Sequence, residues 1–189
     1  MNIHLVSAVV ALSVVSTQIA AQTFPPQHWA GESGLLSLGE NGQVDLSAAD
    51  PMDILRIEEA FIRWGLYYDE GRSDLLPSLF TESGEMVATL GSAEPIATFT
   101  GPEEIGGYVD ATLEQQGDQR RHSITNFLVQ EISESEASAM AYGIVMVAAD
   151  GLSVGSSVVY TGDLTKGDDG VWKFERLTIA IDDYAGNLN

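Results

Sequence analysis

The sequence lacks cysteine and is poor in basic residues. With no Cys among 189 residues, disulfides, thiolate zinc sites and cysteine nucleophiles are excluded, so packing and hydrogen bonds must stabilise the fold. Eight Lys and Arg residues stand against 28 Asp and Glu residues, which gives a formal net charge of -20. Nucleic acids and anionic membranes bind proteins through cationic side chains, so neither is an expected partner. An acidic surface of this kind is typical of exported or salt-exposed proteins.

Long apolar runs are also scarce, and the clearest one lies near the start of the chain. Residues 5–16 form an apolar block of about twelve residues, whereas a membrane span needs ~20. Small residues up to Ala21 offer a site for signal peptidase. We therefore predict a signal peptide over residues 1–21 and a secreted or periplasmic mature protein without a membrane segment. The alternative is a buried N-terminal helix, because the first residues contain no Lys or Arg.

Motifs for metal, phosphate and serine chemistry are missing as well. The three histidines, His4, His28 and His122, are too scattered to form a metal site. No glycine-rich phosphate loop leads into a helix, and no Gly-x-Ser-x-Gly elbow occurs between a strand and a helix. We predict that the protein uses no metal, nucleotide or redox cofactor.

The length predicts one domain with a sizeable core. Residues 22–49 are rich in Gly, Ser, Pro and Gln, which predicts a loose leader laid over the domain, with Trp29 and Leu35-Leu36 as candidate anchors. The domain itself is predicted over residues 50–185.

The pattern of the domain predicts helices first and then an antiparallel meander. Asp50 and Pro51 begin a helix, and Gly71 ends it. Its apolar face is formed by residues at spacings of 3, 4, 3 and 4, namely Ile54, Ile57, Phe61, Trp64 and Tyr68. We then predict a short helix at 74–80, short strands at 85–89 and 96–100, a helix at 101–116, and long strands at 121–132, 137–149, 154–164 and 171–182. This order predicts an α+β fold with helices on one face of a sheet.

Several short phrases, taken in order, resemble the SnoaL-like branch of the NTF2-like superfamily. They are YYDEGRSD at 67–74, LFT at 79–81, FTGPE at 99–103, RHSITN at 121–126 and DGVWKF at 169–174. The resemblance covers about residues 51–184 and is nearest to scytalone dehydratase and the hexachlorocyclohexane dehydrochlorinases. It implies an NTF2-like cone, in which a curved antiparallel or mixed sheet wraps around a long N-terminal helix and encloses a pocket.

The same resemblance implies a catalytic dyad. Catalytic members of the family carry an Asp at the end of the first helix and a His at the start of the first long strand, and Asp69 and His122 match these positions. Imidazole titrates near neutrality, so it can take a proton from carbon and return it. A carboxylate on its other nitrogen fixes the tautomer and stabilises the imidazolium. The implied roles are general base for His122 and orienting residue for Asp69.

Two polar residues are candidate catalytic auxiliaries, and five apolar residues are candidates for the pocket wall. Tyr68 could orient a substrate oxygen, and Asn126 could donate a hydrogen bond to a carbonyl. The candidate wall residues are Phe61, Trp64, Met86, Phe127 and Met146.

Periodicity alone leaves the orientation of the dyad open. Asp69 falls on a helix flank with Ile62 and Leu66, outside the apolar seam. Around His122, polar and apolar residues occur on both alternating faces of the strand, so the buried face is not defined. The structural alternatives to a dyad are a solvated acid at a helix end and a histidine whose polar atoms are satisfied locally.

We predict a cofactor-independent enzyme of the lyase or dehydratase, isomerase or polyketide cyclase type, acting on a small hydrophobic molecule. The complete scytalone dehydratase pattern is absent, because residues 144–148 contain no second histidine and residues 85–88 contain no tyrosine. The alternative is a non-catalytic module that binds a small ligand or dimerises. The resemblance also implies a homodimer.

Overall fold

A computed structural model describes residues 25–39, 44–47 and 49–184, so the predicted signal segment 1–21 lies outside the described residues. The helical elements are α1 (Trp29–Glu32), α2 (Pro51–Asp69), the 3-10 helix η2 (Leu76–Leu79) and α3 (Gly101–Gln115). The strands are β1 (Phe80–Leu90), β2 (Ala97–Thr100), β3 (Gln119–Ile132), β4 (Glu136–Ala148), β5 (Leu152–Lys166) and β6 (Trp172–Tyr184). This order confirms the α+β class. None of the helices in the described part is long and apolar enough to cross a membrane.

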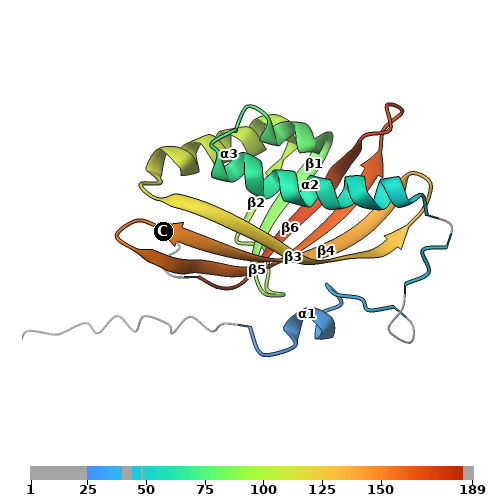
Figure 1. The fold of residues 1–189 in the computed structure, drawn as a ribbon, viewed down its shortest axis with the longest axis horizontal. Coiled ribbons are helices and arrows are strands. Elements are labelled where there is room, and N and C mark those ends of the chain that lie inside the picture. Colours follow the sequence, from blue (N-terminus) through green and yellow to red (C-terminus); the bar gives the residue numbers. More distant parts are fainter. Residues whose placement is uncertain (1–24, 40–43, 48, 185–189) are drawn as a thin grey trace, which may run out of the picture.

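The six strands form one mixed, curved sheet in the order β2-β1-β6-β5-β4-β3. The β1–β6 pair is parallel, whereas the other neighbouring pairs are antiparallel. Helices α2 and α3 lie on one face of the sheet, here called the inner face, and α1 lies on the opposite, outer face (Figure 1). The space between α2 and the inner face is therefore where the main core forms.

Helix α2 begins and ends where local sequence signals predict. The Asp50 carboxylate accepts a hydrogen bond from the backbone N–H of Met52 at 2.9 Å, and Pro51 occupies the first turn. Gly71 adopts a left-handed conformation with φ 64°, which a residue without Cβ takes up easily, just after the helix. The predicted apolar face of α2 is buried at Ile57 and at its aromatic positions.

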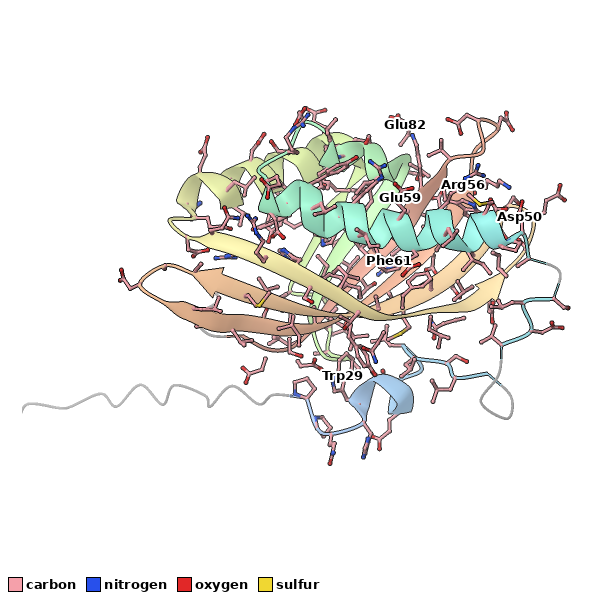
Figure 2. The ribbon with its side chains drawn as sticks, viewed as in Figure 1. Trp29, Asp50, Arg56, Glu59, Phe61 and Glu82 are labelled. Atoms are coloured by element: carbon pink, nitrogen blue, oxygen red, sulfur yellow. The ribbon has the colours of Figure 1, made fainter. Side chains whose placement is uncertain are left out.

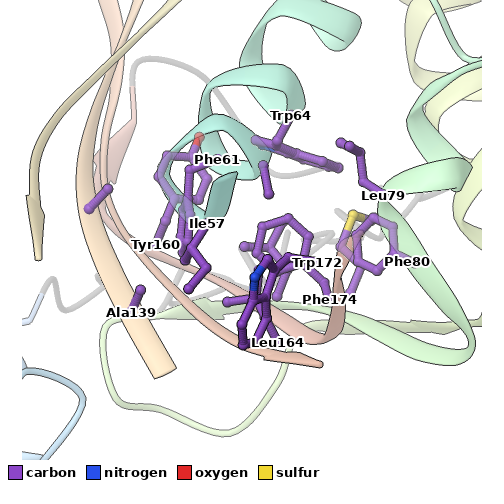
Figure 3. Packing of buried hydrophobic residues seen from close by; sticks show 14 of the residues in the cluster. Ile57, Phe61, Trp64, Leu79, Phe80, Ala139, Tyr160, Leu164, Trp172 and Phe174 are labelled. Carbon is purple, nitrogen blue, oxygen red and sulfur yellow. The ribbon is translucent and has the colours of Figure 1, made fainter. Parts of the chain in front are cut away.

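The main core packs aromatic rings from α2 against the inner face of the sheet. Phe61 contacts Phe174 with ring centroids 5.2 Å apart and Phe127 with centroids 5.6 Å apart, both edge to face. Figure 2 shows Phe61 reaching from α2 toward the sheet, and Figure 3 shows the surrounding cluster. Gly162 on β5 leaves room for these rings, because a Cβ at this position would lie 2.7 Å from the Phe174 ring.

One short helix is tighter and shorter than predicted, and the first strand begins earlier. The helix predicted over 74–80 is the 3-10 helix η2, and β1 then begins at Phe80 instead of Glu85. The pairing of β1 with β6 shifts register between Phe80 and Glu85. Because this irregularity breaks the alternation of buried and exposed residues, the first half of β1 shows no period-two pattern.

The leader has a fixed place on the outer face. Trp29 in α1 is buried against Met140, Val159 and Ala180, and its indole Nε1–H donates to Asp182 at 2.7 Å. Leu35 and Leu36, the other two predicted anchor residues, pack against the same cluster. Figure 2 shows Trp29 directed from α1 toward the sheet. The part of the leader that the structure describes is therefore anchored by the predicted residues.

A buried carboxylate joins the start of α2 to the sheet. The side chain of Asp53 is 8% exposed and accepts hydrogen bonds from the Trp172 indole Nε1–H at 3.0 Å and from Lys166 Nζ at 2.8 Å. Lys166 ends β5 and Trp172 begins β6, so one carboxylate fixes the hairpin between these strands against the helix. Both groups donate hydrogen bonds to the Asp53 carboxylate, and these bonds stabilise its charged form.

Candidate active site

The last residue of α2 and a residue near the start of β3 meet between the helix and the inner face. Nδ1 of His122 lies 2.6 Å from Oδ1 of Asp69, and the backbone N–H of His122 donates to Oδ2 at 2.7 Å. The side chains are 3% exposed for Asp69 and 9% exposed for His122. An acid at a helix C-terminus opposes the helix dipole, so its burial here depends on these two hydrogen bonds. The structure thus brings together the two residues that the sequence proposed as a dyad.

Gly65 makes this close approach of helix and strand possible. It lies one turn before Asp69 on α2, and a Cβ at this position would come within 2.9 Å of the His122 Cβ. Any larger residue would push α2 away from β3 and lengthen the contact between Asp69 and His122. The glycine that weakens the helix intrinsically is therefore needed where the two elements touch.

We expect Gly65→Ala to destabilise the protein by about 1–3 kcal/mol, because the added methyl overlaps His122. Gly107→Ala in α3 is the matched control, since a Cβ there meets nothing within 4 Å, and it should stabilise the fold by about 0.5–1 kcal/mol. Urea denaturation of both variants measures the difference. Stabilisation by Gly65→Ala would show that α2 and β3 are not in tight contact at this position.

A β-bulge in β3 explains why alternation could not orient His122. Strand β3 pairs regularly with β4 up to Thr125 and shifts register before Leu128. Asn126, at φ 53°, lies in the shifted segment. Before the bulge, His122 and Ile124 face the inner side, whereas after it Phe127 takes that side. The inward-facing residues of β3 therefore have even numbers before the bulge and odd numbers after it.

The same bulge excludes Asn126 from the dyad. Asn126 is exposed and lines a groove beside Tyr142 and Trp29, on the outer face of the sheet. The prediction of Asn126 as a catalytic auxiliary is therefore wrong. The extra residue in the strand turns this side chain away from His122, and no pattern in the sequence marked the bulge.

Tyr68 lies directly against the dyad. Its ring packs edge to face on the His122 ring with centroids 5.2 Å apart, and the residue is buried. Burial raises the pKa of Tyr68 to about 12, although nearby Arg120 opposes this effect. The phenol is therefore protonated at neutral pH and available as a hydrogen-bond donor.

The predicted wall residues divide between the two faces of the sheet. Phe61, Trp64 and Met86 are buried in the main core, and Phe127 is half-buried against the same core. Met146 is wrongly predicted, because it lies on the outer face and is 36% exposed. Strand β4 turns its alternate residues inward, and these are Ala137, Ala139, Ala141, Gly143 and Val145.

The geometry of the dyad leaves one ring nitrogen for chemistry. Nδ1 of His122 is held by Asp69, whereas Nε2 has no hydrogen-bond partner among the described residues. Three side-chain atoms among the described residues are fully buried without a hydrogen-bond partner, namely Trp64 Nε1, Thr81 Oγ1 and Gln116 Oε1. Nε2 of His122 is not among them. An imidazole held in this way can take up a proton at Nε2 while the carboxylate stabilises the resulting cation.

Further residues shape the site without having been predicted. They are Gly65 and Gly143, which permit close approaches, and Tyr160, a tyrosine buried in the main core. A glycine inside a strand or helix is the only signal in the sequence that could have marked such contacts. The described residues contain no group of three or more His, Asp or Glu side chains arranged to hold a metal ion.

Comparison with solved structures defines the class of fold. An NTF2-like protein with a cystatin-like fold from Novosphingobium aromaticivorans is 22% identical, covers 71% of this chain and 85% of its own, and has a TM-score of 0.60. Rv3472 of Mycobacterium tuberculosis, of unknown function, is 24% identical over 73% of this chain and 79% of its own, with a TM-score of 0.61. ActVI-ORFA of Streptomyces coelicolor is 17% identical over 68% and 96%, with a TM-score of 0.59. The fold is therefore NTF2-like, as predicted.

The family follows from the sequence itself. Residues 52–178, about two thirds of the chain, match the SnoaL-like domain. The protein belongs to the SnoaL-like family, which confirms the predicted family. A search of curated proteins found no match for the chain.

Proposed function

We propose that this protein is a cofactor-independent acid–base enzyme that moves a proton on a small hydrophobic molecule. His122 acts as general base through Nε2, and Asp69 positions and stabilises the imidazole. The observation that supports this proposal is the 2.6 Å contact between Asp69 and Nδ1 of His122, in a setting where Nε2 has no partner among the described residues.

The proposed reaction begins with proton transfer from carbon. Nε2 of His122 removes a proton from a carbon next to a carbonyl group, and the electron pair of the C–H bond moves into an enolate. The carboxylate of Asp69 stabilises the imidazolium, which then returns its proton to the substrate. Return to another carbon gives isomerisation, loss of a leaving group gives elimination, and attack by the enolate on a second carbonyl gives cyclisation. The ring of Tyr68 packs against the His122 ring, and its hydroxyl is the proposed donor of a hydrogen bond to the same substrate.

Exchange of α-protons in D₂O tests this proposal without knowledge of the natural substrate. Cyclohexanone is a small apolar ketone, and NMR follows the replacement of its α-protons by deuterium. We expect the wild-type protein to accelerate this exchange above the buffer rate and His122→Ala to return the rate to that of buffer. A wild-type rate equal to the rate in buffer alone would contradict the proposed proton abstraction.

A module without chemistry, which dimerises or binds a small ligand, is the competing proposal, and the dense interior favours it over an enzyme. Phe61, Phe80 and Phe174 are each no more than 1% exposed and fill much of the space between α2 and the sheet, which leaves less room for turnover of a substrate. Such a module would not exchange the protons of cyclohexanone, and His122→Ala would leave any binding of the ketone unchanged. Titration and exchange measured on the same sample therefore separate the two proposals.

Export and self-association are two further proposals that come from the sequence. Export by a signal peptide cleaved near Ala21 agrees with the acidic composition of the remaining chain. N-terminal sequencing of the protein from the periplasm or medium tests it. Pairing of two chains is implied by the family resemblance, and sedimentation analysis of the purified protein tests it.

A further inference from the structure

A groove lies between the leader and the outer face of the sheet. Its volume is about 700 Å³, within the range of sites for small molecules. Residues 25–31, which include part of α1, form one wall, and residues of β3, β4, β5 and β6 form the floor. The wall has a fixed position, because Trp29 is buried and its indole Nε1–H donates to Asp182 at 2.7 Å. The groove is therefore a built feature of the fold, on the opposite side of the sheet from α2 (Figure 1).

The floor of the groove exposes apolar surface. Tyr142 and Ile144 are alternate residues of β4 on the outer face, and they are 38% and 44% exposed. Pro25 and Leu36 of the leader line the same groove. Large apolar side chains that remain open to water beside a fixed wall are typical of binding sites. The floor thus offers an area on which a ring or a short alkyl chain of a ligand can lie.

A carboxylate without a counter-ion lies in this groove. Asp182 on β6 is half-buried, and it accepts hydrogen bonds from the Trp29 indole and, at 2.7 Å, from the Ser157 hydroxyl. Both donors are neutral, and Asp182 has no ion-pair partner among the described residues. A carboxylate has about four acceptor positions, so two bonds leave it able to accept more. No Lys or Arg is among the described residues that line the groove, so the groove fits a cation and repels an anion.

Two residues with an unusual backbone border the groove. His28 has φ 66° and Asn126 has φ 53°, and they are the described residues other than glycine with positive φ. Both line the groove. Left-handed backbone at residues that carry a Cβ concentrates at functional sites, where the surrounding structure holds it in place. The bulge in β3 turns the Asn126 amide to the outer face, where it can bond a polar group of a ligand.

We propose that this groove binds a small organic cation with an apolar body, such as an aromatic or aliphatic amine. Its ammonium group donates to the Asp182 carboxylate, and its apolar part lies on Tyr142 and Ile144. The net charge of -20 raises the concentration of cations near the surface, which favours the same class of ligand. This site does not rest on the proposed acid–base function, because His122 lies on the inner face, against Gly65 of α2.

Three phenyl compounds of similar size test the charge preference of the groove. They are phenethylammonium, phenethyl alcohol and phenylacetate, which carry a positive charge, no charge and a negative charge. NMR titrations are made at about pH 8, because His28 also lines the groove and an ordinary imidazole is neutral there. We expect the ammonium to bind about 10-fold more tightly than the alcohol, since its hydrogen bond to a carboxylate is charge-assisted but partly open to water. Phenylacetate should bind most weakly.

The indole of Trp29 reports on the site, because its acceptor is the same carboxylate that receives the ammonium group. Its N–H signal should move as the ammonium is added and move less with the alcohol. Trp172 serves as the internal reference, since its indole donates to Asp53 in the main core. A shift of both signals together would indicate a general effect of the added salt, and would overturn the groove as the binding site.

Asp182→Asn removes the charge and keeps an oxygen that can accept from the Trp29 indole. We expect this variant to bind the ammonium and the alcohol equally well, which is a loss of about 10-fold for the ammonium. Glu32→Gln is the matched control, because it removes one exposed acid from α1 that does not line the groove. Its preference for the ammonium should equal that of the wild type. An unchanged preference in Asp182→Asn would overturn the proposed contact.

Tyr142→Ala tests the floor of the groove without touching the anchor of the leader. We expect the ammonium and the alcohol to bind about 3- to 10-fold more weakly, because the phenyl ring loses an apolar surface. Tyr108→Ala is the matched control, since Tyr108 is also 38% exposed but lies in α3, on the other side of the sheet. If Asp182→Asn detaches the leader, Tyr142→Ala decides alone, and wild-type affinity in that variant overturns the site.

The result is separable from the dyad. His122→Ala should keep the affinities for all three probes, because the groove lies on the opposite face of the sheet. Loss of α-proton exchange with retained binding of the ammonium would therefore leave the groove in place. Equal affinities for the three probes, or no saturable binding of the ammonium by the wild-type protein, would overturn the groove as a cation site and leave the dyad untouched.

Discussion

Asp69→Asn is expected to slow the exchange of cyclohexanone α-protons by about 10²- to 10⁴-fold. The carboxylate contacts Nδ1 of His122 at 2.6 Å and accepts from the His122 backbone N–H at 2.7 Å. An amide preserves the shape of this side chain but loses the negative charge that stabilises an imidazolium. It also offers an NH₂ group that favours the wrong tautomer of His122. Exchange rates measured by NMR at one pH and with saturating ketone give the effect directly.

The neighbouring acid provides a matched control for this prediction. Glu70→Gln removes a carboxylate that is 61% exposed and pairs with Arg121 on the surface, at 2.9 Å. We expect its exchange rate to equal that of the wild type. Because Asp69 and His122 act as a unit, the double variant Asp69→Asn/His122→Ala should be no slower than His122→Ala alone. A wild-type rate in folded Asp69→Asn would show that the pair only connects the helix to the strand.

Asp53→Ala is expected to lower the free energy of unfolding by about 2–4 kcal/mol. The substitution leaves the buried Trp172 indole N–H without its acceptor and Lys166 without its counter-ion. It also frees the start of α2 from the β5–β6 hairpin. Urea denaturation compares it with Asp110→Ala, which removes an exposed acid from α3 and should change stability by less than about 0.5 kcal/mol. Similar values for the two variants would contradict a structural role of Asp53.

The same residue predicts a pH dependence of stability. The hydrogen bond from Lys166, followed by that from Trp172, holds the pKa of Asp53 below its ordinary value of 3.8. A carboxyl group whose pKa is lower in the folded state contributes its full stabilisation above the ordinary value and loses it as the pH falls through the folded value. The stability difference between wild type and Asp53→Asn should therefore be constant near neutrality and shrink below about pH 4. A difference that does not change between pH 7 and pH 3 would contradict this interpretation.

Local signals predicted the helices of this protein well. The cap at Asp50, the proline that follows it and the glycine at position 71 each act within a few residues, so they defined α2 without knowledge of the rest of the fold. The long strands were also found, because their runs of β-branched and apolar residues are separated by short turns. The early start of β1 at Phe80 was missed because it depends on the irregular pairing of Phe80 with β6, which is a long-range contact.

The candidate site was only partly accessible from the sequence. The family resemblance selected Asp69 and His122 as partners, and the structure brings them into contact. The resemblance could not predict on which face of the sheet the side chains of Asn126 and Met146 lie. The bulge in β3 and the alternation of buried residues in β4 determine these faces.

By itself, the sequence determined the α+β class, the limits of α2, the acidic character and the absence of thiol chemistry. These properties depend on composition and on interactions between residues close together in the chain. Only the tertiary structure decided which side of β3 faces inward and that Gly65 lets α2 approach His122. Strand register and side-chain burial depend on contacts between segments far apart in the chain, and a pattern of neighbouring residues does not contain them.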